Sequence, residues 1–188
     1  MNNLNFIAES LKHLKTVGTV FPCSPACAHK LIKPVNFQTA SVLVELGGGN
    51  GAITKEILPR MRSDARLIVF EVNPDFAQSL RELGDPRLTV VQDSAEKIED
   101  YLKREQIDTV DAVISTLPFV LMEEAVRNRI MDSVMRVVKQ GGCFTQIQYS
   151  LMTAKEMKSR FKNLRIDFTL FNAPPAFFYI VTKEPAVA

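Results

Sequence analysis

Short apolar runs alternate with segments of helical periodicity along most of the chain. The runs are rich in valine, isoleucine and leucine, and they are bounded by glycine, proline, asparagine or aspartate. Continuous apolar runs of this kind indicate strands that are buried on both faces of a parallel sheet. Five such strands are expected: one in residues 41–51, a run that ends in glycines and feeds a turn, and four at residues 67–70, 88–91, 110–114 and 143–149.

The segments between these runs have apolar residues three and four positions apart, which predicts helices. Asn73–Pro74 is typical of a helix start, and Asp93 or Ser94 is expected to cap the helix after the third strand. Gly141–Gly142 is expected to end the fourth helix and to open the fifth strand. The expected helices cover residues 52–61, 76–83, 95–104, 122–138 and 154–161.

The last two apolar segments, 165–171 and 177–182, face each other across Asn172–Pro175. A short proline turn cannot hold a parallel crossover, so the two segments are predicted to form an antiparallel hairpin. The predicted fold class is α/β, a doubly wound, Rossmann-like sheet that is mostly parallel, has seven strands and ends in an antiparallel hairpin.

The first forty residues precede this sheet and are expected to be helical. Leu4, Ile7, Leu11 and Leu14 fall on one helical stripe, and a second short helix is expected to start at Ser24–Pro25. Residues 1–40 hold four lysines and one glutamate, a charge of +3, while the whole chain carries +2. We expect residues 1–40 to form a helical lid that can contact an anionic membrane surface, and residues 41–188 to form the main domain.

Composition and charge narrow the function classes. A chain of 188 residues that is 46% hydrophobic and 23% charged fits one globular domain without a membrane span, and a cytoplasmic location is expected. Cys23 and Cys27 have no histidines at zinc-ligand spacing, so no metal is expected. The weak net charge of +2 argues against a nucleic-acid partner.

A glycine-rich loop follows the first expected strand. Gly47, Gly49 and Gly51 come after Glu45 and complete the pattern E-x-G-x-G-x-G, while Gly47, Gly49 and Ala52 also satisfy the dinucleotide pattern G-x-G-x-x-A. Glycines at a strand-to-helix turn let a cofactor approach the backbone without meeting a Cβ atom.

Two acids lie at the ends of the next strands. Glu71 follows the second strand, where a carboxylate can accept hydrogen bonds from ribose hydroxyls, and Asp93 follows the third, where it could receive an adenine amine. Each of these acids, and Glu45, also has a structural interpretation. Glu45 could cap a helix or pair with a lysine, and its contribution to binding is expected to be indirect; Asp93 could serve only as a helix cap.

Together, the E-x-G-x-G-x-G loop, Glu71, Asp93 and the terminal hairpin resemble class I methyltransferases that use S-adenosyl-L-methionine. The segment after the fourth strand, Ser115–Phe119, would then face the cofactor and the transferred methyl group. It resembles the N-L-P-Y/F motif of ribosomal RNA adenine dimethyltransferases, but Thr116 replaces the asparagine that holds the target amine. This departure, and the lack of a following RNA-binding segment, argue against a nucleic-acid base as the substrate.

Four segments resemble bacterial phospholipid N-methyltransferases more closely. They are Gly18–Ser24, Leu117–Phe119, Gln146–Ser150 and Asn172–Phe178. The resemblance implies that Phe21 and Ser24 help to close over the cofactor and that Glu71 binds its ribose. It further implies that Tyr149 and Asn172 lie near the lipid headgroup, beside Leu117 and Pro118. Cys23 replaces the family's usual serine, which leaves the contact at that position open.

The expected function is therefore N-methylation of phosphatidylethanolamine or its methylated forms by a cytoplasmic enzyme, peripheral on the inner face of the membrane. Tyr149 could hold a methylated ammonium by a cation–π contact, or it could simply pack in the core. A methyltransferase for a soluble amine and a catalytically silent cofactor-binding module stay open as alternatives.

Overall fold

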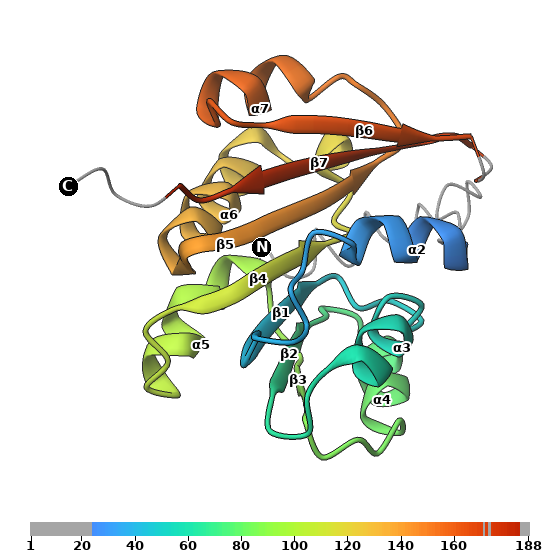
Figure 1. The fold of residues 1–188 in the computed structure, drawn as a ribbon, viewed down its shortest axis with the longest axis vertical. Helices are drawn as coiled ribbons and strands as arrows, with labels where there is room; N and C mark the ends of the chain where they lie inside the picture. Colours follow the sequence, from blue (N-terminus) through green and yellow to red (C-terminus); the bar gives the residue numbers. More distant parts are fainter. Residues whose placement is uncertain (1–23, 171, 173, 185–188) are drawn as a thin grey trace.

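The computed structural model describes residues 24–170, 172 and 174–184. Its sheet has seven strands in the order β3-β2-β1-β4-β5-β7-β6 (Figure 1). Strands β1 to β5 run parallel, and β7 lies antiparallel between β5 and β6. The predicted fold class is thereby confirmed. The strands are β1 (Val42–Leu46), β2 (Arg66–Phe70), β3 (Leu88–Val91), β4 (Val110–Ser115), β5 (Val138–Gln148), β6 (Arg165–Thr169) and β7 (Ala176–Thr182).

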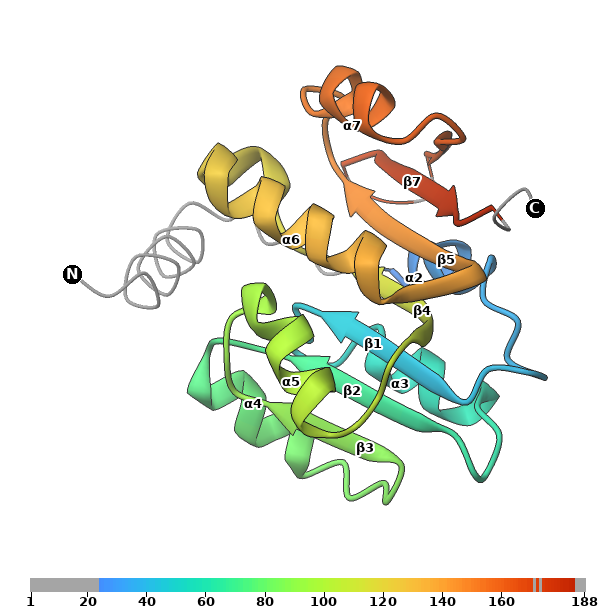
Figure 2. The same cartoon turned by 90° about the vertical axis from the view of Figure 1, so that its left-hand side faces the viewer.

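Helices cover both faces of the sheet (Figure 2). Side chains of α2, α3 and α4 pack with one face of the strands, and those of α5, α6 and α7 pack with the other. The core therefore consists of two apolar layers separated by the sheet. The helices are α2 (Pro25–Ile32), α3 (Thr54–Ile57), α4 (Pro74–Arg81), α5 (Ile98–Arg104), α6 (Glu124–Val137) and α7 (Ala154–Arg160), with 3-10 turns η1 (Leu58–Arg60), η2 (Ala95–Lys97) and η3 (Phe119–Leu121).

The strand order reverses between β1 and β4. The chain builds β1, β2 and β3 outward in one direction and then returns to place β4 on the other side of β1. At the carboxyl end of this pair, Leu46 lies in register with Ser115. Ligands of doubly wound sheets bind at such a reversal, outside the carboxyl ends of the strands. The loops that follow β1 and β4 are thus adjacent at the position expected for a site.

The helix predicted over residues 52–61 is shorter than expected. The α-helical part, α3, covers Thr54–Ile57, and the 3-10 turn η1 continues to Arg60. Pro59 has no N–H group to donate, so it interrupts the α-helical hydrogen-bond pattern at this point.

Gly141–Gly142 does not end the fourth helix, and that prediction was wrong. Helix α6 already ends at Val137, and β5 begins at Val138. Gly141 has φ +75°, and the β4–β5 register shifts between Val110 and Ala112. A Cβ atom on Gly142 would lie 2.7 Å from the Asp111 carbonyl oxygen. The two glycines therefore form an irregularity inside a long strand, where one backbone turns and another approaches closely.

Several expectations concern residues that lie outside the described part of the chain. These are the apolar stripe of Leu4, Ile7, Leu11 and Leu14, the cofactor-closing role of Phe21, and the substitution at Cys23. The division into a lid over 1–40 and a main domain over 41–188 stays a prediction. The second expected helix is present as α2, and the Ser24 hydroxyl caps it by accepting a hydrogen bond from the Cys27 N–H at 3.2 Å.

Candidate functional site

The glycine-rich loop, residues 47–51, is hydrogen-bonded to the neighbouring strand β2. The Gly47 N–H donates to the Phe70 carbonyl at 2.8 Å, and the Gly49 N–H donates to Glu71 Oε2 at 2.8 Å. The carboxyl ends of β1 and β2 are thus joined by a backbone contact and a side-chain contact. The structure brings the predicted loop and the predicted ribose acid together.

Both carboxylate oxygens of Glu71 accept backbone hydrogen bonds. Besides the bond from Gly49, Oε1 accepts from the Asn73 N–H at 2.8 Å, at the start of α4. Burial raises the pKa of Glu71 above its usual value, and the backbone donors of Asn73 and Gly49 oppose that rise. A carboxylate oxygen can accept more than one hydrogen bond, so Glu71 can organise the loop and still receive hydroxyl groups.

Glu45 is fully buried in β1, beneath the glycine loop. Its Oε2 accepts a hydrogen bond from the Thr54 hydroxyl at 2.7 Å, rather than pairing with a lysine as one interpretation proposed. Its Oε1 has no hydrogen-bond partner among the described residues. Burial, with the nearby Glu71 charge, raises the pKa of Glu45 to about 8, although the Thr54 hydrogen bond opposes the shift. This acid favours the neutral form until a positive group comes close to it.

Two neighbouring glycines of the loop have different surroundings. A Cβ atom on Gly48 would lie 2.5 Å from Val69 Cγ1 and 2.6 Å from Leu80 Cδ1, inside the core. A Cβ atom on Gly49, where φ is +50°, would meet nothing within 4 Å. Gly48 is therefore needed for packing between β2 and α4, whereas Gly49 borders open space where a ligand can approach the backbone.

This difference gives a testable prediction. We expect Gly48→Ala to lower the free energy of unfolding by about 1–3 kcal/mol through overpacking. Gly49→Ala is expected to cost about 1 kcal/mol of backbone strain and to weaken cofactor binding about tenfold. Denaturant unfolding and calorimetric titration measure the two effects. If Gly49→Ala bound the cofactor as well as the unsubstituted protein does, the cofactor would not lie against Gly49.

Asp93 follows β3 and is half-buried. The helix that comes next is capped by Ser94, whose hydroxyl accepts a hydrogen bond from the Glu96 N–H at 3.3 Å. Asp93 Oδ1 accepts from the Ser94 N–H at 2.6 Å. Ser94 is therefore the cap, and the interpretation of Asp93 as only a helix cap was wrong.

The segment after β4 contacts the glycine loop. The Thr116 hydroxyl donates to the Gly47 carbonyl at 2.6 Å, and a Cβ atom on Gly47 would lie 3.2 Å from Leu117 Cδ2. Ser115 is buried, and its hydroxyl accepts from the Leu117 N–H at 3.3 Å. The threonine that replaces the asparagine of the adenine enzymes thus joins two loops.

Two glutamines of β5 fix this segment; the sequence interpretation included them in the Gln146–Ser150 segment but gave neither a role. Gln146 and Gln148 are buried, and their Nε2 atoms donate to the Leu117 carbonyl at 2.8 and 3.1 Å. They are two residues apart on a strand and so share one face. Two amides at alternate positions near the end of a strand expected to be buried were the available signal, since a buried polar group requires a partner.

We expect the double substitution Gln146→Met and Gln148→Met to lower the kcat of the methyl transfer expected from the sequence by about 10- to 100-fold, because the Leu117–Pro118 segment loses its support. Cofactor affinity should change much less, since the glycine loop keeps its own contacts. Gln140→Met, at the exposed start of the same strand, is the matched control. A double variant with an unchanged kcat would contradict the positioning role.

At the hairpin turn, Asn172 contacts the start of α2. Its Oδ1 accepts from the Ser24 N–H at 3.2 Å, and its Nδ2 donates to the Pro174 carbonyl at 3.0 Å. Ser24 and Asn172, predicted to serve the same site, are thus brought together. Tyr149 follows β5 directly and packs against the core layer of α2. That packing agrees with the structural interpretation of Tyr149, and its contact with a headgroup stays a prediction.

A family model described as a methyltransferase domain matches residues 43–142, just over half of the 188 residues. The match includes the glycine loop, Glu71, Asp93 and the Ser115–Phe119 segment. The chain belongs to the class I S-adenosylmethionine-dependent methyltransferases.

Two relatives of this methyltransferase have different substrates in their names. It is 31% identical to the ornithine lipid N-methyltransferase of Singulisphaera acidiphila over 177 residues, which cover 93% of this chain and 92% of that protein. It is 28% identical to the ribosomal RNA small subunit methyltransferase A of Thermotoga petrophila over 136 residues, covering 70% of this chain and 50% of that protein. The chain thus spans about half the length of the second relative.

Solved structures confirm the fold of the methyltransferase. An S-adenosylmethionine-dependent O-methyltransferase from Thermotoga maritima superposes with a TM-score of 0.65 at 14% identity, covering 95% of this chain and 72% of that one. The N-methyltransferase NodS from Bradyrhizobium japonicum gives a TM-score of 0.65 at 12% identity, covering 87% and 98%. Similarity at this level shows the architecture alone.

The residues of the site fit S-adenosylmethionine. Gly49 leaves open space beside the backbone, and Glu45 has a buried oxygen without a partner among the described residues. Both features suit a ligand that lies against the loop and carries positive charge. Within the described residues, no group of histidine, cysteine, aspartate or glutamate side chains could hold a metal ion. The same part of the chain has no helix that is long and apolar enough to cross a membrane.

Proposed function

We propose that this methyltransferase transfers a methyl group from S-adenosylmethionine to the amine of a membrane-lipid headgroup. The observation that carries the proposal is the relative named ornithine lipid N-methyltransferase, with 31% identity over 93% of this chain and 92% of that protein. Because this alignment runs almost end to end, it includes the segments after β4, β5 and β6 as well as the cofactor loop. An ornithine lipid and phosphatidylethanolamine, the substrate expected from the sequence, both carry a primary alkyl amine.

Exposed apolar side chains at the carboxyl edge of the sheet support a lipid acceptor. Since β6 runs parallel to β5, the segments after β4, β5 and β6 all lie at this edge. Five large apolar side chains in or beside these segments are 49–78% exposed. They are Leu121, Leu151, Met152, Phe168 and Leu170. Apolar side chains grouped around a site suit a substrate that has acyl chains.

The contacts of Thr116 disfavour a nucleic-acid base as the acceptor. The Thr116 hydroxyl donates to the Gly47 carbonyl, and the Leu117 carbonyl already accepts from Gln146 and Gln148. Position 116 therefore has no side-chain amide to hold the amine of an adenine, and the Leu117 carbonyl already accepts two hydrogen bonds.

In the proposed cofactor site, Glu71 accepts hydrogen bonds from the ribose hydroxyls and Asp93 receives the adenine amine. Gly47, Gly49 and Gly51 let the ligand approach the backbone, and Glu45 acts indirectly through its charge. Ser115, together with Phe21 and Ser24, completes the binding residues. When bound, the cofactor supplies an electrophilic methyl group on a sulfonium.

The residues on the acceptor side are proposed to align the amine and exclude water, since methyl transfer is an in-line displacement that depends mainly on alignment. Leu117 and Pro118 form the wall that Gln146 and Gln148 fix in place. Tyr149 and Asn172 lie at the ends of the strands that border the headgroup. A contact between the Tyr149 ring and a methylated ammonium would contribute about 0.5–2 kcal/mol.

A radiolabelled methyl-transfer assay tests the proposal. Vesicles that contain ornithine lipid or phosphatidylethanolamine are compared with soluble ornithine, ethanolamine and ribosomal RNA as acceptors. We expect label in a lipid fraction, and at least about 100-fold less in the soluble amines, because these lack the acyl chains that bind the apolar edge. Label in soluble amines or RNA without label in lipid would overturn the proposal. Cofactor binding without transfer to any acceptor would favour the silent module.

A further inference from the structure

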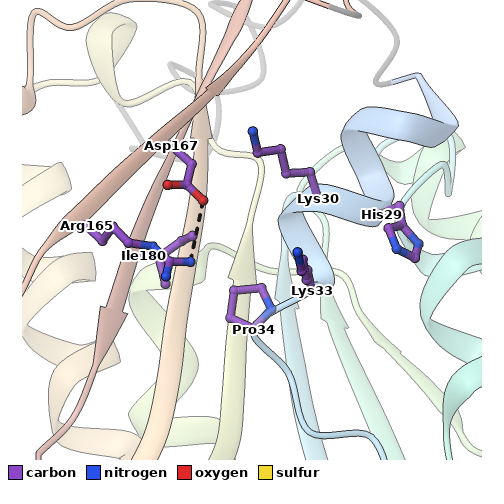
Figure 3. A pocket seen from close by; sticks show the side chains of 7 residues that line it. All are labelled: His29, Lys30, Lys33, Pro34, Arg165, Asp167 and Ile180. Atoms are coloured by element: carbon purple, nitrogen blue, oxygen red, sulfur yellow. Dashed lines mark ion pairs between the residues drawn. The ribbon is translucent and has the colours of Figure 1, made fainter.

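A pocket of about 420 Å³ lies between α2 and the hairpin strands β6 and β7 (Figure 3). It is lined by His29, Lys30, Lys33, Pro34, Arg165, Asp167 and Ile180. Arg165 is the first residue of β6 and pairs in register with Ile180. β6 is the outermost strand on its side of the sheet, and β4, β5 and β7 lie between it and β1, which the glycine loop follows, so this pocket is separate from the cofactor site.

Positive charge dominates the pocket. Lys30, Lys33 and Arg165 are basic, and Asp167 is the single acidic residue among the lining residues. The Arg165–Asp167 pair is 3.5 Å long, with side chains 65% and 36% exposed, so solvent screens it strongly. Neither Lys30 nor Lys33 takes part in any ion pair recorded for the described residues.

The cations come from two different walls. Lys30 reaches from α2 toward β6, where its ammonium donates to the Phe168 carbonyl and lies 5.5 Å from the centre of the Phe178 ring (Figure 3). Arg165 projects from the facing strand, and Lys33 is one helical turn after Lys30. A ligand between the walls would therefore meet positive groups on more than one side.

We propose that this pocket binds a phosphate group that is attached to an organic moiety. Phosphate oxygens point in several directions and can accept from both walls, whereas a carboxylate presents its two oxygens on one side. The apolar side chains of Pro34 and Ile180 provide contact for the organic part. The same cations repel an ammonium or a methylated ammonium, so the pocket is not a second site for the methyl acceptor.

The phosphate can come from a phospholipid headgroup or from a soluble phosphate compound. In either case the ligand bridges α2 to β6, and α2 also begins at Ser24 beside Asn172. Helix α2 would then be held at its start by the contact with Asn172 in the hairpin turn, and at its end by the ligand in the pocket. The proposal does not depend on which amine is methylated.

The test uses the full chain and two probes, inorganic phosphate and monomeric dihexanoyl phosphatidylglycerol, with dihexanoylglycerol as the phosphate-free control. The variant Lys33→Gln/Arg165→Gln removes one cation from each wall. Lys103→Gln/Arg104→Gln on α5 removes the same charge from another exposed surface and is the matched control. Titration calorimetry measures binding of each probe, and of S-adenosylmethionine, to all three proteins.

We expect the pocket variant to bind the phosphate-bearing probe at least about tenfold more weakly, because charge-assisted hydrogen bonds are lost, while the control changes less than about twofold. Cofactor affinity should be unchanged in both variants. Binding of both probes identifies the phosphate itself as the recognised group, and binding of the lipid probe alone identifies a headgroup. Equal weakening in the two variants, binding of the phosphate-free control as tightly as the lipid, or no binding of either phosphate probe would overturn the proposal.

Discussion

Replacing Glu71 by glutamine is expected to weaken S-adenosylmethionine binding about 100-fold, since hydrogen bonds to a charged group contribute about 1.5–3 kcal/mol each. A glutamine has one acceptor oxygen, so it can accept from the Gly49 N–H or the Asn73 N–H, but its amide group then faces the other donor. The variant thus loses the negative charge for the ribose hydroxyls and one of the contacts that hold the loop.

Glu82→Gln is the matched control for this experiment. Glu82 is exposed at the end of α4, where it accepts from the Gln78 side chain. Calorimetric titration of both variants gives the two dissociation constants, and thermal unfolding shows whether each variant is folded. A Glu71→Gln protein that is folded and binds the cofactor within about twofold of the unsubstituted affinity would remove Glu71 from the proposed ribose site.

The second large effect is a loss of stability with rising pH, caused by Glu45. Its pKa is about 8 in the folded protein, compared with 4.5 for an unperturbed glutamate. At pH values between these two pKa values, Glu45 is protonated in the folded state and ionised in the unfolded state. The protonated Glu45 therefore contributes to the free energy of unfolding at low pH, and this contribution is lost as the pH rises to about 8. Since each pKa unit corresponds to about 1.4 kcal/mol, the loss from this group is on the order of 5 kcal/mol.

Glu45→Gln keeps the shape of the neutral acid and removes the titration. We expect the ligand-free variant to be less stable than the unsubstituted protein at pH 5 by at most about 1 kcal/mol and clearly more stable at pH 9. Denaturant unfolding across this range is the measurement, and Glu124→Gln, at the exposed start of α6, is the control. Parallel pH profiles for Glu45→Gln and the unsubstituted protein would show that the buried carboxyl keeps an ordinary pKa.

The sequence predicts those features that depend on residues close together along the chain. The apolar runs gave β1 to β5, the proline turn gave the hairpin, and the spacing of Gly47, Glu71 and Asp93 placed the loop and two acids at one edge of the sheet. Periodicity carries this information because each strand or helix is specified by its own residues.

Contacts between distant residues were not predictable in this way. The hydrogen bonds from Gln146 and Gln148 to Leu117, and from the Ser24 backbone to Asn172, depend on which strands become neighbours. Local pattern also failed at Gly141–Gly142, because a glycine pair looks alike at a helix end and at an irregularity within a strand. The basic pocket is a further case, since α2 and β6 supply its charges from opposite ends of the chain.

In the proposed site, the cofactor lies across the carboxyl ends of β1, β2 and β3, against the glycine loop. A crystal structure of the methyltransferase with S-adenosylhomocysteine tests this placement most directly. We expect ribose hydroxyls within hydrogen-bond distance of Glu71, the adenine amine beside Asp93 and ligand atoms in contact with Gly49. A ligand bound elsewhere, or one whose ribose does not reach Glu71, would contradict it.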